Sequence, residues 1–219
     1  TSMELKKNSQ TFQDFNSTIL KPSNEEQVQQ IIRYCYKNNL SIEIVGTGSK
    51  KEIGKNLQCK KILDMSNISG IMNYKPDELY ITVKASTPIN SIQEELKKNN
   101  QYLAFEPVNF EKIFEKDSKE GTIAGVLSCN FSGSRRFKVG SARDHILGFK
   151  GYNGKGEKIK SGGTVQKNVT GYDLSKLITG SFGTLVVLTE ITLKVLPLES
   201  DTKTIVISGL PLEDSLEIM

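Results

Sequence analysis

The sequence is short of the residues on which several large classes of enzyme depend. Its 219 residues include one histidine, His145, so a histidine-rich zinc site, a Ser-His-Asp triad or a Cys-His pair would be difficult or impossible to build. His145 follows Asp144 and precedes an apolar run, which predicts a surface position at the start of a strand. No nucleophile–base arrangement surrounds it, so neither a catalytic role nor a metal site is expected.

Cysteines, long apolar runs and clustered charge are also scarce. Cys35, Cys59 and Cys129 form no C-x-x-C pair and cannot all pair with one another, which favours a reducing compartment. No run approaches the roughly 18 apolar residues of a spanning helix, and the first four residues show no apolar signal region. The net charge of +4 is spread along the chain, which argues against a nucleic-acid surface. We therefore expect a cytoplasmic globular protein.

The first half of the chain alternates helix and strand. Ser23 and Glu26 have the spacing of a capping box, and apolar residues at helical spacing follow as far as Asn39. Strands are predicted at 40–45, 62–64 and 79–83, and a second helix after Pro88. This alternation is typical of α/β structure.

The second half predicts neighbouring strands with little helix between them. Ile146–Tyr152 and Glu157–Lys160 flank Asn153-Gly154-Lys155-Gly156, which is a hairpin signal. A long β-rich stretch covers 184–196, so an antiparallel sheet is expected. Short helices are predicted at 123–127 and 173–178, and a strand and a helix at 202–207 and 211–219.

Three glycine-rich segments are the strongest functional signal. The first, Val45-Gly46-Thr47-Gly48-Ser49-Lys50, directly follows a predicted strand, and its backbone N–H groups can form an anion-binding nest. It is not a Rossmann motif, because the third glycine and the helix are missing, and Gly-Lys-Ser/Thr never occurs. Alone, this segment is better explained as an ordinary turn from strand to loop.

The other two segments combine glycine with hydroxyl groups and arginines. One runs from Gly121-Thr122-Ile123-Ala124-Gly125 to Ser132–Arg136 and Gly140–Asp144, and the other from Lys167–Leu174 to Gly180–Leu185. Small residues free the backbone for close approach, and arginines balance phosphate charge. Turns and surface arginines explain each segment alone. Three in one chain favour a shared ligand site over a glycine-rich domain without a cofactor.

The order of these motifs carries a family resemblance. The chain contains, in sequence, Leu63-Asp64-Met65-Ser66, Gly121–Gly125, Gly140–Asp144, Gly171-Tyr172-Asp173-Leu174 and Gly183-Thr184-Leu185. Over about residues 18–197 it resembles the FAD-binding domain of the vanillyl-alcohol oxidase / p-cresol methylhydroxylase superfamily. Within that superfamily it is most similar to the FAD-binding subunits (E subunits) of glycolate oxidase.

The resemblance implies an α+β fold with two lobes, one α/β and one mainly antiparallel, with FAD extended between them. The expected divisions are an N-terminal extension (1–17), a first lobe (18–110), a second lobe (111–197) and the start of a largely absent cap domain (198–219).

The resemblance also implies which residues bind FAD. The first loop would hold the pyrophosphate, residues from 121 to 144 would line the pyrophosphate, ribityl and flavin region, and residues 183–185 would meet the adenosine end. The full set is Val45, Gly46, Thr47, Gly48, Ser49, Lys50, Pro107, Gly121, Thr122, Ala124, Gly125, Ser128, Ser132, Arg136, Ser141, Asp144, Gly171, Gly183, Thr184 and Leu185.

The implied function is that of a non-covalent FAD subunit of a glycolate oxidase-like 2-hydroxy-acid oxidoreductase. Some relatives attach FAD to a histidine of the first loop, but this loop carries Ser49 and Lys50 instead. The implied partners are a catalytic flavin subunit and an iron–sulfur subunit, with at most peripheral membrane association through them. A non-catalytic electron-transfer or structural FAD subunit, and an FAD oxidase for another hydroxy acid or sugar, stay open. Arg136, Arg143 and Lys167 suit phosphate or solvent as well as substrate, so no catalytic residue is assigned.

Overall fold

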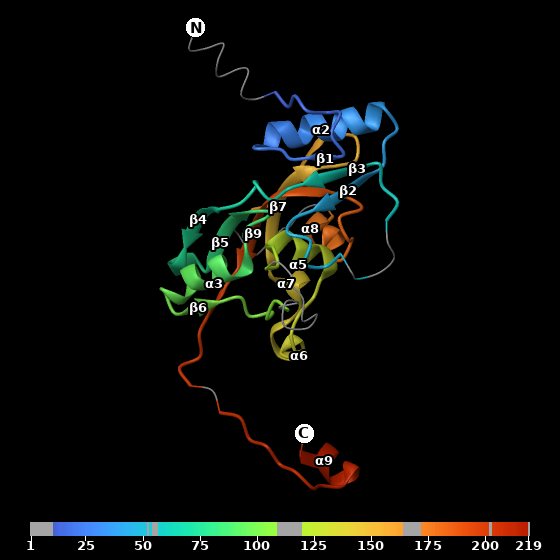
Figure 1. The fold of residues 1–219 in the computed structure, drawn as a ribbon. Helices are drawn as coiled ribbons and strands as arrows, with labels where there is room; N and C mark the ends of the chain where they lie inside the picture. Colours follow the sequence, from blue (N-terminus) through green and yellow to red (C-terminus); the bar gives the residue numbers. More distant parts are fainter. Residues whose placement is uncertain are drawn as a thin grey trace.

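The computed structural model describes residues 11–51, 53, 57–108, 120–163, 172–201 and 203–218. Its strands form a three-stranded sheet, a five-stranded sheet and a two-stranded pair, and helices pack on both larger sheets (Figure 1). The predicted α+β class is confirmed.

The three-stranded sheet is parallel and is covered by one long helix. Strands β1 (Ile19–Leu20), β3 (Lys61–Asp64) and β2 (Ile42–Val45) lie in that order. Helix α2 (Glu25–Lys37) buries its apolar face against this sheet, as its helical spacing predicts. We call this unit the first lobe.

The N-cap of α2 lies one residue later than the sequence predicts, and the predicted capping box does not form. The N-cap is Asn24, not Ser23, because the Asn24 side chain accepts a hydrogen bond of 2.9 Å from the Gln27 backbone N–H. Gln27, not Glu26, reaches back over the start of the helix, where its Oε1 accepts from the backbone N–H of Ser23, the residue before the N-cap, at 2.8 Å. The side-chain amides of Asn24 and Gln27 therefore make the hydrogen bonds at the start of the helix that the sequence assigned to a hydroxyl and a carboxylate.

The five-stranded sheet is entirely antiparallel, as predicted. Its order is β4 (Ile71–Lys75), β5 (Tyr80–Lys84), β9 (Val187–Lys194), β7 (Ile146–Tyr152) and β8 (Lys158–Gly162). A 3₁₀ turn at Pro76–Glu78 joins β4 to β5, and the predicted hairpin joins β7 to β8. We call this sheet and its helices the second lobe.

Four helices share the core of the second lobe. They are α3 (Ile89–Lys97), α5 (Ile123–Cys129), α7 (Ala142–His145) and α8 (Leu174–Ile178), and they pack with Ile191 and Leu193 of the central strand. A further short helix, α6 (Arg136–Val139), lies at the edge of the domain (Figure 1). Helices α3, α5 and α8 confirm the helices predicted from sequence.

The five-stranded sheet and its core include elements that lie before residue 110. Strands β4 and β5 and helix α3 all precede that position, yet they share the sheet and core of β7, β9 and α5. We therefore propose that the first lobe covers residues 18 to about 68. The two lobes also share an apolar contact, because Tyr152 and Val187 of the second lobe lie in the core of the first.

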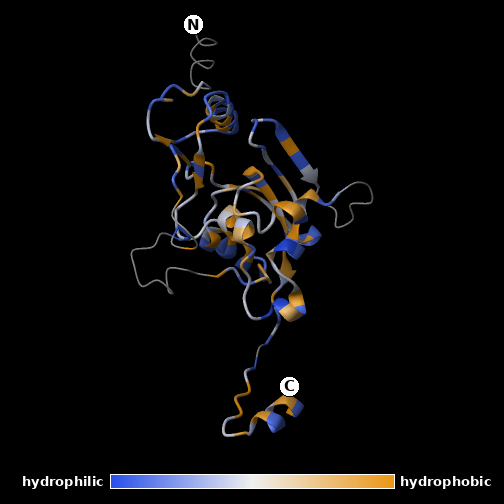
Figure 2. Cartoon of the chain, turned by 90° about the vertical axis from the view of Figure 1, so that its right-hand side faces the viewer, coloured by the Kyte–Doolittle hydropathy of each residue, from blue (hydrophilic) through white to orange (hydrophobic). Residues whose placement is uncertain are grey.

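The chain leaves the second lobe through β10 (Leu196–Pro197), which pairs with β6 (Gln101–Tyr102). Residues 198–201 and 203–218 then extend away from both lobes and end in α9 (Leu212–Ile218) (Figure 1). The strand predicted at 202–207 does not form over 203–207, because no strand of the described chain pairs with it. Figure 2 shows apolar residues in this extended segment, where Ile205 is 84% exposed.

His145 is buried, so the predicted surface position is wrong. Only 2% of it is exposed, and its ring packs 5.4 Å from that of Phe105, measured between centroids. Its Nε2 lies 2.9 Å from the Val139 carbonyl oxygen. The sequence pattern predicted the start of a strand at His145. His145 is instead the last residue of α7, and its side chain points into the core.

Candidate cofactor site

Two of the predicted glycine-rich segments meet where β2 ends and α5 begins. The Thr47 hydroxyl donates a hydrogen bond of 2.6 Å to the Glu120 carbonyl oxygen. A Cβ placed on Gly46 would lie 2.8 Å from Thr122 Oγ1, so the loop approaches α5 as closely as only glycine allows. Segments that are 73 residues apart in the sequence, counted from Thr47 to Glu120, are thus in direct contact.

The ammonium group of Lys50 lies at this junction. A Cβ placed on Gly121 would be 3.2 Å from Lys50 Nζ, and one on Gly125 would be 3.4 Å from it. Nζ also donates a hydrogen bond of 3.3 Å to Ser49 Oγ. Burial lowers the pKa of Lys50, and the nearby Cys129 thiol raises it in return. A half-buried cation beside two glycines and a turning backbone suits a phosphate group.

Thr122 links the two segments instead of facing a ligand with a free hydroxyl. It is the N-cap of α5, where its side chain accepts from the Gly125 backbone N–H at 3.3 Å, and only 4% of it is exposed. Ala124 lies within the same helix, and its N–H donates to the Ala85 carbonyl oxygen. These residues therefore fix the position of the glycines.

The segment before β9 joins the same junction from the other side. The Phe182 N–H donates to the Ser128 carbonyl oxygen at 2.8 Å. Gly183 has φ +75°, a conformation that favours glycine, and a Cβ there would lie 3.6 Å from Ile44 Cδ1 of β2. Thr184 and Leu185 are exposed beside it.

The segment from Ser132 to Asp144 is held by its own hydrogen bonds. Ser132 Oγ accepts from the Ala142 N–H at 2.9 Å, which ties this segment to α7. Asp144 Oδ2 accepts from the backbone N–H and the hydroxyl of Ser141 at 2.8 and 2.9 Å. The backbone hydrogen bond from Ser141 holds the pKa of Asp144 below its ordinary value, so this carboxylate caps α7.

Three predicted residues lie away from the junction or beyond what is described. Arg136 is exposed on α6. Pro107 follows Glu106, whose carboxylate accepts from the Arg135 N–H at 3.1 Å, so the two segments are neighbours. Gly171 lies outside the described residues.

A pocket of about 410 Å³ opens between the lobes next to Gly183, and the sequence did not predict its first-lobe wall. Part of that wall comes from α2 and β2, which supply Ile32, Tyr36 and Ile44, while residues 183–187 face them from the second lobe. The residue in the sequence that could have indicated this wall was Tyr36, a large aromatic residue near the end of α2. In the structure 55% of Tyr36 is exposed. A mainly apolar pocket with an aromatic side chain suits a planar ring.

Neither a metal centre nor a membrane span is found in the parts of the chain that the structure describes. No group of three or more histidine, cysteine or carboxylate residues there is arranged to hold a metal ion. None of the helices there is long and apolar enough to cross a bilayer.

The fold and the candidate site together define a two-lobed α+β domain whose lobe junction has the features of a site for a phosphate-bearing nucleotide cofactor. A family model described as an FAD binding domain matches residues 17–162, and the chain belongs to this family. FAD is therefore its cofactor, and the family resemblance seen in the sequence is confirmed.

Individual relatives agree with this assignment. The chain is 40% identical over 184 residues to the glycolate oxidase subunit GlcE of Escherichia coli K12, covering 84% of this chain and 48% of the relative. It is 26% identical over 203 residues to a D-lactate dehydrogenase of Anaerostipes hadrus, covering 90% of this chain and 40% of the relative. The chain thus spans about half or less of the length of these relatives.

Solved structures confirm the fold. An alkyldihydroxyacetonephosphate synthase superposes with a TM-score of 0.67 at 20% sequence identity. The superposition covers 84% of this chain and 32% of the synthase chain.

Proposed function

We propose that this chain binds FAD non-covalently, as the FAD-binding subunit of a glycolate oxidase-like 2-hydroxy-acid oxidoreductase. The observation that carries the proposal is the meeting of the Val45–Lys50 loop with Gly121 and Gly125 around the Lys50 ammonium group. The identity of 40% to a protein named as a glycolate oxidase subunit supports the substrate class.

Different segments of the site would bind different parts of the cofactor. The Val45–Lys50 backbone and the Lys50 ammonium would hold the diphosphate, since both supply positive charge or N–H donors without side-chain bulk. The adenosine half would enter the 410 Å³ pocket beside Gly183. The flavin half would extend along the segment from Ser128 to Asp144, whose backbone is fixed by the Ser132 and Asp144 hydrogen bonds.

Residue types in the site favour a non-covalent complex. Ser49 and Lys50 stand in the loop where some relatives carry a histidine, and the one histidine of the chain is buried against Phe105. When bound, FAD supplies the redox chemistry, and the protein supplies binding, orientation and charge.

Two other functions are supported by specific observations. The glycolate oxidase relative is named as a subunit, which is compatible with a non-catalytic electron-transfer or structural FAD subunit. The similarity to a D-lactate dehydrogenase favours instead an oxidoreductase for another hydroxy acid. In either case we propose a cytoplasmic complex with a second flavin subunit and an iron–sulfur subunit.

Anaerobic spectroscopy of the assembled complex tests these alternatives. The full-length protein is co-expressed with the two partner subunits, and glycolate or D-lactate is added while flavin absorbance is followed. Bleaching of the FAD on this subunit by glycolate supports the proposal. Bleaching confined to the partner flavin identifies an electron-transfer or structural subunit, and faster bleaching by D-lactate identifies a different substrate.

A further inference from the structure

The turn between β7 and β8 is a rigid loop that lies on α2 of the other lobe. The Asn153 side chain accepts from the backbone N–H groups of Lys155 and Glu157, each at 3.0 Å. The Gly156 N–H donates to the Asn153 carbonyl oxygen at 2.9 Å. These bonds fix the shape of the turn without help from the first lobe.

The turn touches α2 at a point where only glycine fits. Gln29 Nε2 donates a hydrogen bond of 2.8 Å to the Gly156 carbonyl oxygen. A Cβ on Gly156 would lie 2.5 Å from Arg33 Cγ and 3.3 Å from the Gln29 carbonyl oxygen. A Cβ placed on Gly154, in the same turn, would have no such neighbour within 4 Å. Gly156 is therefore required by the contact between the lobes as well as by its φ of +75°.

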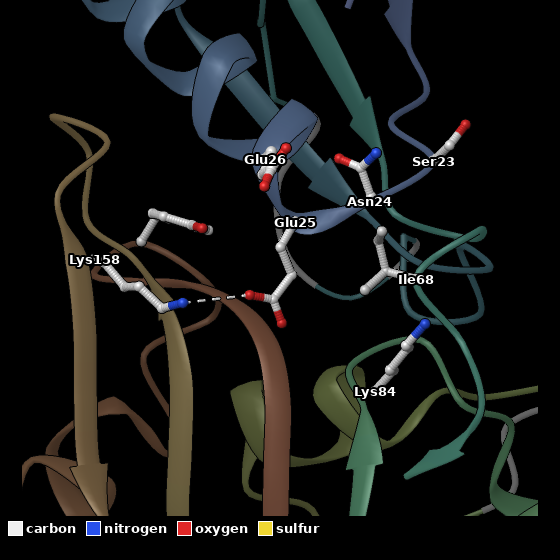
Figure 3. A pocket seen from close by; sticks show the side chains of 8 residues that line it. Ser23, Asn24, Glu25, Glu26, Ile68, Lys84 and Lys158 are labelled. Atoms are coloured by element: carbon white, nitrogen blue, oxygen red, sulfur yellow. Dashed lines mark ion pairs between the residues drawn. The ribbon is translucent and has the colours of Figure 1, made fainter. Parts of the chain in front are cut away.

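An ion pair extends this contact along the helix. Lys158 Nζ of β8 lies 3.6 Å from Glu25 Oε2, across a cavity of about 380 Å³ (Figure 3). Glu25, Gln29 and Arg33 are spaced four residues apart, so they form one stripe along α2. The apolar face of α2 thus packs in the core of its own lobe, and the stripe of Glu25, Gln29 and Arg33 contacts the hairpin of the other lobe.

The hairpin also forms one end of the pocket assigned above to adenosine. Tyr152 and Gly154 of the hairpin line that pocket together with Ile32 and Tyr36 of α2. The distance between the turn and α2 therefore sets the width of the pocket.

We propose that the contact of Gly156 with Gln29 and Arg33 is a clamp that holds the pocket at the width the adenosine half of FAD requires. Gly156 is then a positioning residue for the cofactor. This inference depends on the proposed function, because it assumes that FAD binds across the lobes.

A methyl group at residue 156 should open the clamp. Carbon atoms in ordinary contact are about 3.5–4.0 Å apart, so the methyl of Gly156→Ala must move about 1 Å away from Arg33 Cγ. That shift breaks the Gln29 hydrogen bond and widens the pocket. We expect FAD and ADP to bind about tenfold more weakly, the effect of losing roughly one hydrogen bond. The affinity for FMN, which lacks the adenosine half, should change by less than about twofold.

Titration of the FAD-stripped full chain with FAD, ADP and FMN measures these affinities. Gly163→Ala, just after β8, is the control, because a Cβ there would have no atom within 4 Å and Gly163 does not line the pocket. It should bind all three nucleotides as the parent does. Arg33→Ala, added to Gly156→Ala, should restore most of the FAD affinity because it removes the clashing carbon. If Gly156→Ala does not fold, Gln29→Ala tests the same contact without steric strain and should weaken FAD and ADP about threefold.

The outcomes separate this inference from the proposed function. Equal affinity of FAD for the parent and the Gly156→Ala and Gln29→Ala variants would overturn the clamp alone. So would equal weakening of FAD and FMN, because a general loss of packing would then be the cause. A parent chain that binds none of the three nucleotides would overturn the proposed function and the clamp with it.

Discussion

Replacing Lys50 with methionine tests the diphosphate site at its charged centre. Methionine keeps most of the apolar stem and removes the ammonium group that lies beside Gly121 and Gly125. A charge-assisted hydrogen bond contributes about 1.5–3 kcal/mol, so we expect FAD to bind about 10- to 150-fold more weakly. Without FAD, the variant should be as stable as the parent or more stable, because burial of the ammonium is unfavourable and lowers its pKa.

The assay is a fluorescence titration of FAD combined with thermal unfolding of the FAD-free protein. Lys51→Met is the matched control, since Lys51 is exposed and its ion pair with Glu43 is long, at 3.9 Å. Its FAD affinity should equal that of the parent. Unchanged affinity in Lys50→Met would refute the assignment of Lys50 to the diphosphate.

The same residue predicts how FAD binding depends on pH. Burial moves the pKa of Lys50 below its ordinary value of 10.5 in the FAD-free protein. The diphosphate prefers the charged form, so the contribution of Lys50 to FAD affinity is complete below this lowered pKa and is lost as the pH rises through it. Titrations at increasing alkaline pH should show this loss in the parent and not in Lys50→Met.

Three further predictions concern other parts of the chain. Gly125→Val and Gly183→Val should abolish FAD retention while circular dichroism shows most of the secondary structure intact; variants as yellow as the parent would disprove the loop placement. Burial lowers the pKa of His145, so the folded state keeps it neutral and loses stability as the pH falls below about 6.5, where the unfolded chain takes up a proton. Urea unfolding of His145→Gln should lack this acid-dependent loss, of at most about 1.4 kcal/mol per pH unit, and an unchanged loss would implicate other groups. Lys98→Ala removes an exposed pair with Glu95 and should leave both the stability of the fold and the FAD affinity unchanged.

Local patterns predicted most of the elements, because their signals lie within a few residues. The apolar spacing of α2 and the Asn153–Gly156 turn are signals of this kind, and both were placed correctly. Strand β4 was missed, because its burial does not alternate and its register shifts between Ile71 and Asn73. A lobe boundary is hard to predict for a related reason: β5 pairs with β9, more than a hundred residues later, and no local pattern records that pairing.

In the candidate site too, the sequence predicts local features but not how distant segments approach one another. The glycine-rich motifs lie in segments that meet at the lobe junction, as Gly46 and Thr122 do, while their role in binding FAD stays a prediction. The position of the Lys50 ammonium beside Gly125 depends on how the two segments approach, which spacing alone does not give. The contact between Gly156 and Arg33 is likewise invisible in the sequence, where Gly156 reads only as a turn residue.

Equilibrium titration of the FAD-stripped chain with FAD, followed by acid precipitation of the complex, tests the central claim most directly. The account predicts saturation at about one FAD per chain, competition by ADP, and complete release of the flavin into the supernatant. A chain that binds no FAD, or whose FAD affinity is unaffected by ADP, would contradict a site in which the loops around Lys50 hold the diphosphate.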